Sequence, residues 1–235
     1  TNDMIAAGIT YVADLSDTLD GPVVINMSLG GPSHSALIEA AINYAISKGV
    51  IIVTSAGNAG EDGLGYTGAL DQVISVASVG WTSDVPEDLN TEDALGNNHQ
   101  LYLSDFSSRP NKDLGQKNKI LDVAAPGHWI VGPYKSRWAP NSNWGYYYVS
   151  GTSMASPHVA GMAALVLQTY PHLNQGDMEF ILKNAAHGNP LPSDGTWSYV
   201  PFYADPFVFY DWSGGDYGAG FLTAENALFS AARHA

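Results

Sequence analysis

The stretch "PVVINMSLGGPSHSALIEAAINYAISKGVIIVTSAGN" covers residues 22–58 and decides the fold. Its runs at 22–27 and 49–55 are continuously apolar and rich in β-branched residues, which is typical of strands buried on both faces of a parallel sheet. Between these runs, residues 35–49 carry apolar side chains at helical spacing, and Gly49 can end that helix in a left-handed conformation. A strand, a helix and a strand at this spacing predict a βαβ unit.

The rest of the chain extends the same architecture. Two more apolar runs, at 72–79 and 120–125, predict further buried strands. Helices are expected at 2–15, 152–170, 176–186 and 223–232. A chain of 235 residues with 45% hydrophobic content can bury one sizeable core. We therefore expect a single α/β domain with several long loops.

Charge, cysteine content and the length of the apolar runs indicate which kinds of partner and location to expect. The formal net charge is -14, so the surface repels nucleic acid, and no nucleic-acid partner is expected. The charge itself is interpreted as favouring solubility. The chain contains no cysteine, which fits a protein exported by a bacterium or an archaeon. No apolar run is long enough to span a bilayer, so no membrane span is expected.

Two strand ends carry candidate binding residues. In open α/β sheets, ligands bind beyond the carboxyl ends of the strands. Here the first strand leads into residues 28–31 and the second into residues 55–58, and both segments contain glycine, which lets another backbone approach closely. Each segment taken alone also has the composition of an ordinary turn.

The segment "SGTSMASPHVAG", residues 150–161, places Ser153 where a helix should begin. A serine in that position can simply cap the helix. Alternatively, the helix N-terminus and its free N–H groups can stabilise a developing oxyanion, with the Asn58 amide as a second donor. Pro157 is expected in the first turn, where proline is tolerated.

Five segments in the same order resemble the subtilases, the subtilisin-like serine peptidases. They are "VINMSLGGPS", "GVIIVTSAGNAG", "ILDVAAPG", "GTSMASPHVAG" and "YGAGFLTAENAL". The likeness extends from about residue 4 to residue 232, and the nucleophile motif is the most specific of the five. It implies an α/β, three-layer subtilisin-like fold with a mostly parallel sheet between helices, incomplete at its N-terminus.

The resemblance also implies site roles. Ser153 would be the nucleophile, and its backbone N–H would form the oxyanion hole with the Asn58 amide. One wall of the P1 pocket, which also pairs with the substrate backbone as an added strand, would be formed by Ser28, Leu29 and Gly30. The opposite wall would be formed by Ser55, Ala56 and Gly57. These small residues predict a roomy pocket that tolerates apolar side chains. No acid stands at its obvious wall positions to select a basic P1 residue, although Glu61 and Asp62 are close in sequence.

Two members of the catalytic triad are missing from this chain. Subtilases order the triad as Asp, His and Ser, and the Asp and His motifs precede the segment that corresponds to residues 24–33. Neither motif is present here, and residues 1–21 contain no histidine. We therefore expect residues 1–235 to be the C-terminal portion of a single subtilase catalytic domain, completed by an N-terminal fragment of the same precursor. Alone, the chain should be inactive, because a serine hydroxyl without a base is a poor nucleophile.

Other segments have two interpretations. The acidic stretch 84–98 is favoured as a solvated loop, with a structural calcium ion, helped by Glu61 and Asp62, as the alternative. The chemistry itself needs no cofactor. The aromatic stretches 144–149 and 197–212 are favoured as packed hairpins, and the alternative is a recognition surface or a dock for a propeptide.

Taken together, the sequence predicts a secreted or extracellular serine endopeptidase that hydrolyses peptide or protein substrates through an acyl-enzyme on Ser153. Two alternatives stay open: an inactive pseudoprotease or peptide-binding module, and an enzyme that transfers the acyl group to an amine.

Overall fold

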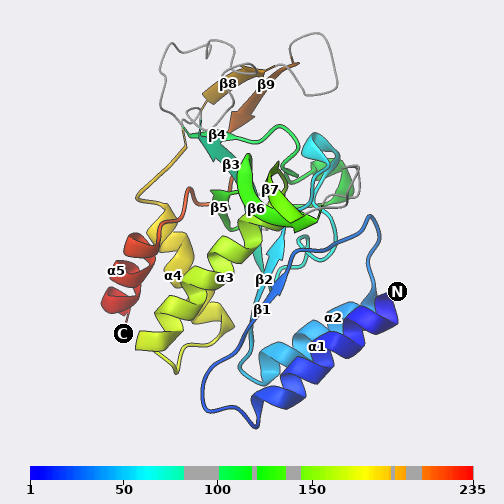
Figure 1. Ribbon diagram of the computed structural model, residues 1–235, viewed down its shortest axis with the longest axis vertical. Helices are drawn as coiled ribbons and strands as arrows, with labels where there is room; N and C mark the ends of the chain where they lie inside the picture. The colour runs from blue at the N-terminus through cyan, green and yellow to red at the C-terminus, as the bar shows by residue number, and fades with distance from the viewer. Residues whose placement is uncertain (82–100, 118–120, 136–143, 192–193, 200–207, 235) are drawn as a thin grey trace.

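The computed structural model describes residues 1–81, 101–117, 121–135, 144–191, 194–199 and 208–234 (Figure 1). Its helices are α1 (Asn2–Ser16), α2 (Ala36–Ser47), α3 (Thr152–Thr169), α4 (Gln175–Ala186) and α5 (Ala224–His234). Its central sheet contains β1 (Val24–Met27), β2 (Ile51–Ser55), β3 (Ile74–Trp81), β4 (Leu101–Leu103) and β5 (Val123–Pro126). The predicted helices and buried strands are therefore confirmed, with ends shifted by a few residues.

The central sheet is mostly parallel. β1 pairs with β2, β2 with β3, and β3 with β5, all in parallel, while β4 pairs antiparallel with the end of β3. Among the described strands, β1 lies at the edge and has a neighbour on one side only. The βαβ unit is formed by β1, α2 and β2, and Gly49 after α2 has the expected positive φ of 82°.

Helices cover both faces of this sheet, as Figure 1 shows. Ile51 and Val53 of β2 belong to a core cluster shared with α3, α4 and α5. Ile52, whose side chain points to the opposite face, belongs to a cluster shared with α1 and α2. This alternation explains the continuous apolar run, because every side chain of β2 is buried. The three-layer architecture is confirmed.

Two polar contacts join α4 to the sheet. The side-chain amide of Gln175 accepts a hydrogen bond from the Ile52 N–H (2.8 Å) and donates one to the Ile52 carbonyl (3.1 Å). The Lys183 ammonium lies 2.8 Å from the Asp122 carboxylate, which also accepts a hydrogen bond from the Ser75 N–H. Burial raises the pKa of the Asp122 carboxyl to about 7, although the Lys183 ammonium acts in the opposite direction.

The remaining strands form two antiparallel hairpins, β6 (Ile130–Lys135) with β7 (Trp144–Val149), and β8 (Asp194–Tyr199) with β9 (Val208–Ser213). The hairpin interpretation of both aromatic stretches is confirmed. The expected packing is wrong for β7, because Trp144, Tyr146 and Tyr148 are exposed. These three side chains share one face of the hairpin, as alternate residues of a strand must.

No helix in the described part of the chain is long and apolar enough to cross a membrane.

Candidate functional site

Ser153 is the second residue of α3, close to the carboxyl ends of β1 and β2. The preceding loop is held in place by the Gly151 N–H, which donates to the Gly127 carbonyl (2.8 Å). Gly151 is the N-cap and has no side chain to bond the first N–H groups of α3. The positive end of the helix therefore stays open beside Ser153.

The Asn58 side chain takes over part of the missing cap. Its Oδ1 accepts hydrogen bonds from the Thr152 N–H and the Thr152 hydroxyl, both at 2.9 Å. Because the oxygen end of the amide is occupied in this way, the NH₂ end is directed away from Thr152. Within the described residues, neither this NH₂ group nor the Ser153 N–H donates a hydrogen bond, so both donors are available.

Pro157 lies deeper in α3 than the sequence predicts. α3 begins at Thr152, which makes Pro157 its sixth residue, beyond the first turn. Since proline has no N–H, the Ser153 carbonyl loses the hydrogen bond that an i→i−4 helix partner would give it. The Ser28 hydroxyl donates to this carbonyl instead, at 2.7 Å.

The hydroxyl of Ser153 lies 3.4 Å from the Ser28 carbonyl, its one hydrogen-bond partner within the described residues. Within the described residues, this hydroxyl makes no hydrogen bond to a histidine. His158 bonds the Met154 carbonyl within its own helix, His34 pairs with Glu39, and His234 pairs with Asp177.

His128 is buried behind the site. Its Nδ1 lies 3.0 Å from the Tyr102 hydroxyl, and its ring stacks on Trp129. Burial lowers the pKa of this imidazole to about 4, against the opposing influence of Asp105. His128 follows Gly127, whose carbonyl accepts a hydrogen bond from the Gly151 N–H, so its packing supports the loop before Ser153.

A cleft of about 640 Å³ opens in front of Ser153. Six of the eight predicted site residues line it: Leu29, Gly30, Ser55, Gly57, Asn58 and Ser153. Ala56 is fully buried and packs into the core instead. Ser28 reaches Ser153 through its hydroxyl rather than through the cleft surface.

The cleft walls depend on close backbone contacts. A Cβ atom on Gly30 would lie 2.6 Å from the Tyr66 carbonyl oxygen, so this position has no room for a side chain. Gly57 has a φ of 111°, a conformation that favours glycine, and a Cβ there would approach the Ser108 hydroxyl to 2.8 Å. The two glycines are therefore required by the shape of the cleft.

Sequence reasoning missed part of the cleft lining. Asp62, Leu64 and Leu114 also line it, so a carboxylate borders the cleft although no acid stands at the predicted wall positions. The neighbouring Glu61 is engaged elsewhere, 3.0 Å from the Arg109 guanidinium. Nearness in sequence was the only available signal, because the fold of the loop after Asn58 decides which acid faces the cleft.

The predicted calcium site stays untested. The acidic stretch 84–98 lies outside the described residues. Within the described part of the chain, no group of three or more His, Asp or Glu side chains could hold a metal ion. Glu61 is paired with Arg109, which leaves Asp62 as the free carboxylate of the two.

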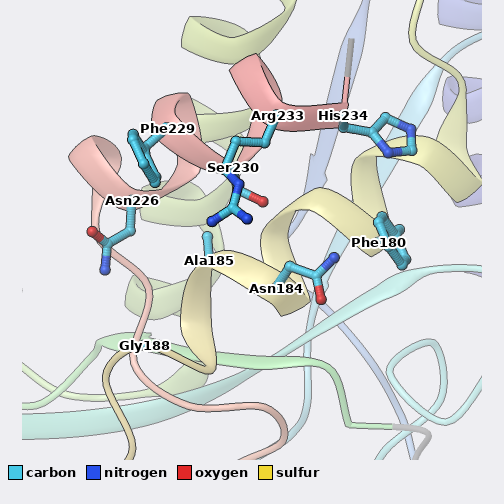
Figure 2. A pocket seen from close by; sticks show the side chains of 9 residues that line it. All are labelled: Phe180, Asn184, Ala185, Gly188, Asn226, Phe229, Ser230, Arg233 and His234. Atoms are coloured by element: carbon cyan, nitrogen blue, oxygen red, sulfur yellow. The ribbon is translucent and has the colours of Figure 1, made fainter.

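A second hollow, of about 550 Å³, lies between α4 and α5 (Figure 2). Phe180, Phe229, Arg233 and His234 are among its lining residues, and the Arg233 guanidinium lies 5.8 Å from the centre of the Phe229 ring. None of the predicted site residues lines it.

Comparison with known proteins places this geometry in context. The Subtilase family matches residues 1–205. The chain is 36% identical over 212 residues to subtilisin from Bacillus sp. (strain TA39), covering 88% of this chain and 45% of that protein. It is 34% identical over 208 residues to an extracellular serine proteinase from Thermus sp. (strain Rt41A), covering 86% of this chain and 42% of that protein.

The solved structure of the S41 psychrophilic protease is also similar, with a TM-score of 0.69 and 32% identity over 95% of this chain and 64% of that one. The chain spans about half the length of the curated relatives that it matches.

Proposed function

We propose that this chain, which belongs to the subtilase family, forms the C-terminal portion of a serine endopeptidase catalytic domain with Ser153 as its nucleophile. One observation carries the proposal. Ser153 lies at the open N-terminus of α3, beside an asparagine amide whose oxygen is bound by Thr152 and whose NH₂ group is available. This arrangement suits the stabilisation of negative charge next to an attacking hydroxyl.

The proposed reaction begins with attack of the Ser153 hydroxyl on the carbonyl carbon of a bound peptide. The carbonyl oxygen becomes an oxyanion, which accepts hydrogen bonds from the Ser153 N–H and the Asn58 NH₂ group. Collapse of this intermediate expels the amine and leaves an acyl-enzyme on Ser153, which water then hydrolyses. No metal or other cofactor takes part in these steps.

The substrate is a polypeptide in extended conformation. Residues Ser28, Leu29 and Gly30 leave the sheet beside the cleft and offer their backbone to an added strand. On the other side of the cleft, Ser55 and Gly57 form the opposite wall, while Ala56 between them is fully buried. The apolar Leu64 and Leu114 side chains extend the pocket beyond these walls.

The missing Asp and His are proposed to come from an N-terminal fragment that docks at β1. Val24 and Ile25 of β1 pack against core clusters on opposite faces of the sheet, yet one edge of the strand has no partner among the described strands. A strand covered on both faces is typical of the interior of a parallel sheet. A parallel strand added there would end near Ser28, whose hydroxyl bonds Ser153, and could therefore deliver a base to the nucleophile.

Export is part of the proposal. The chain has no cysteine, and one of its relatives is named as an extracellular enzyme. A propeptide as folding partner and a calcium ion bound by residues 84–98 remain predictions.

The test co-expresses this chain with the upstream segment that carries the Asp and His motifs. Native and denaturing mass spectrometry should show the two polypeptides bound together only under native conditions. A fluorophosphonate should then add one label to Ser153 and stop casein hydrolysis, and Ser153→Ala should abolish both labelling and hydrolysis.

Peptide binding without labelling or hydrolysis would identify a pseudoprotease and contradict the proposal. Peptides joined to added amines, in place of hydrolysed products, would identify an acyl transferase.

A further inference from the structure

We infer that Ser28 is a positioning residue for the nucleophile: its hydroxyl replaces the helix hydrogen bond that Pro157 removes from the Ser153 carbonyl. The inference rests on the proposed function, because it concerns how Ser153 is aimed at a substrate. It assigns to the Ser28 side chain a task separate from the backbone pairing proposed for that residue.

One backbone hydrogen bond is missing near the start of α3. In an α-helix, each N–H donates to the carbonyl four residues earlier, so the partner of the Ser153 carbonyl would be residue 157. Pro157 cannot donate. The Ser28 hydroxyl, 125 residues away in sequence, fills the gap with a 2.7 Å hydrogen bond. This bond ties the second residue of α3 to the segment that follows β1.

The direction of the Ser28 hydroxyl is itself determined. The Asn26 side-chain NH₂ donates to the Ser28 oxygen at 3.0 Å, so the Ser28 hydrogen is left for the Ser153 carbonyl. The Asn26 amide is oriented in turn by the Ser156 hydroxyl, which donates to its Oδ1 at 2.6 Å. This chain of bonds begins on α3, crosses to β1 and returns to α3 at the nucleophile.

The geometry couples the nucleophile to the substrate strand. Fixing the carbonyl of Ser153 restrains the peptide plane that follows it, and so restrains the backbone from which the Ser153 hydroxyl extends. The same residue that fixes the carbonyl also begins the segment proposed to pair with substrate. An error in either position would change the distance of attack, and small misplacements of reacting groups slow catalysis strongly.

The test is a double-mutant cycle in the co-expressed two-chain protein. Ser28→Ala should lower kcat roughly tenfold and change KM less than about twofold, because the loss concerns orientation and leaves the backbone intact. Pro157→Ala restores an N–H for the Ser153 carbonyl. In that background, Ser28→Ala should change kcat less than about twofold. The exposed Ser33, changed to alanine, is the matched control.

Two results would overturn the inference. One is an equal loss of kcat on Ser28→Ala whether residue 157 is proline or alanine, and the other is an unchanged kcat on Ser28→Ala when Pro157 is present. Thermal unfolding separates this failure from failure of the proposed function. If the unaltered protein neither hydrolyses casein nor reacts with fluorophosphonate, the proposed function is wrong. In that case, Tm values of the same four variants still test the inference. Ser28→Ala should lower Tm more when residue 157 is proline than when it is alanine, and equal losses of Tm would overturn the inference.

Discussion

The N-termini of α3 and α4 begin in opposite ways. α4 carries a complete capping box, in which the Asn174 side chain accepts from the Asp177 N–H and the Asp177 carboxylate accepts from the Asn174 N–H, both at 3.1 Å. α3 begins after a glycine, without a side-chain cap of its own. A helix start that serves only the fold satisfies its N–H groups internally, whereas the start that carries Ser153 leaves donors free.

The sharpest test of this contrast removes the proposed donor at α3. Asn58→Ala should lower kcat of the proposed two-chain enzyme by roughly 10²–10³, with little change in KM. That magnitude is the one known for the oxyanion-hole asparagine of subtilisin, a relative of this chain. Steady-state kinetics on a peptide substrate measures the effect. Asn174→Ala, which alters the cap of α4, should leave kcat unchanged. A loss of similar size in both variants would remove the functional distinction between the helix starts.

A second test removes the ion pair between Lys183 of α4 and Asp122. Lys183→Met leaves the Asp122 carboxyl, which is 2% exposed, without its cation. The free energy of unfolding should fall by about 3–5 kcal/mol at pH 8. The loss should shrink at pH 5, because burial raises the pKa of Asp122 to about 7 and the carboxyl is then neutral.

Denaturant titrations at the two pH values measure this difference. Glu179→Gln is the control, since Glu179 also contacts Lys183 (3.1 Å) but lies nearer the surface, and its pair should contribute less than about 1 kcal/mol. A larger loss at pH 5 than at pH 8 would contradict the expected protonation of Asp122.

Acid should lower the stability of the fold by protonating His128, which packs beside the loop that precedes α3. Burial lowers the pKa of this histidine from 6.5 to about 4 in the folded chain. Between these values the unfolded chain binds more protons, so stability rises with pH and is lost as pH falls from 6.5 towards 4. The loss amounts to about 3 kcal/mol when it is complete. Comparing unfolding free energies of the unaltered chain and His128→Gln across this range isolates the effect, and parallel pH curves would refute it.

The smallest effect concerns the cap of α4. Asn174→Ala removes the acceptor for the Asp177 N–H and should lower the free energy of unfolding by about 1 kcal/mol. Urea titration measures this loss. Asn174→Ser keeps a capping oxygen and should recover most of it, and the absence of recovery would show that the amide has another structural role.

Local patterns were sufficient to predict most of the fold. The apolar run at 49–55 predicted β2 because both faces of that strand are buried, and the left-handed Gly49 followed from helix geometry. The resemblance brought Ser153 and Asn58 together, and the structure places both at one cleft. These features depend on residues close in sequence or on a long specific motif.

Features that depend on distant contacts were not predictable. Pro157 was placed in the first turn although the predicted start of the helix at residue 152 is correct, and the Ser28 hydroxyl that compensates for the proline lies far away in sequence. The bond from Ser28 to Ser153 joins residues 125 apart, and no local pattern indicates it. The cleft position of Asp62 depends on the path of a loop, and the exposure of Trp144 depends on where a hairpin leaves the domain.

The two hydrogen bonds between the Gln175 amide and the Ile52 backbone make the fold sensitive to deamidation. The amide presents one donor and one acceptor to a strand backbone, and Gln175 is 7% exposed. Deamidation to glutamate would exchange the NH₂ group for an oxygen and place an acceptor against the Ile52 carbonyl. The new acid would have to stay protonated to keep both bonds, so a lesion that changes the chain's mass by about one dalton would make the junction of α4 and β2 sensitive to pH.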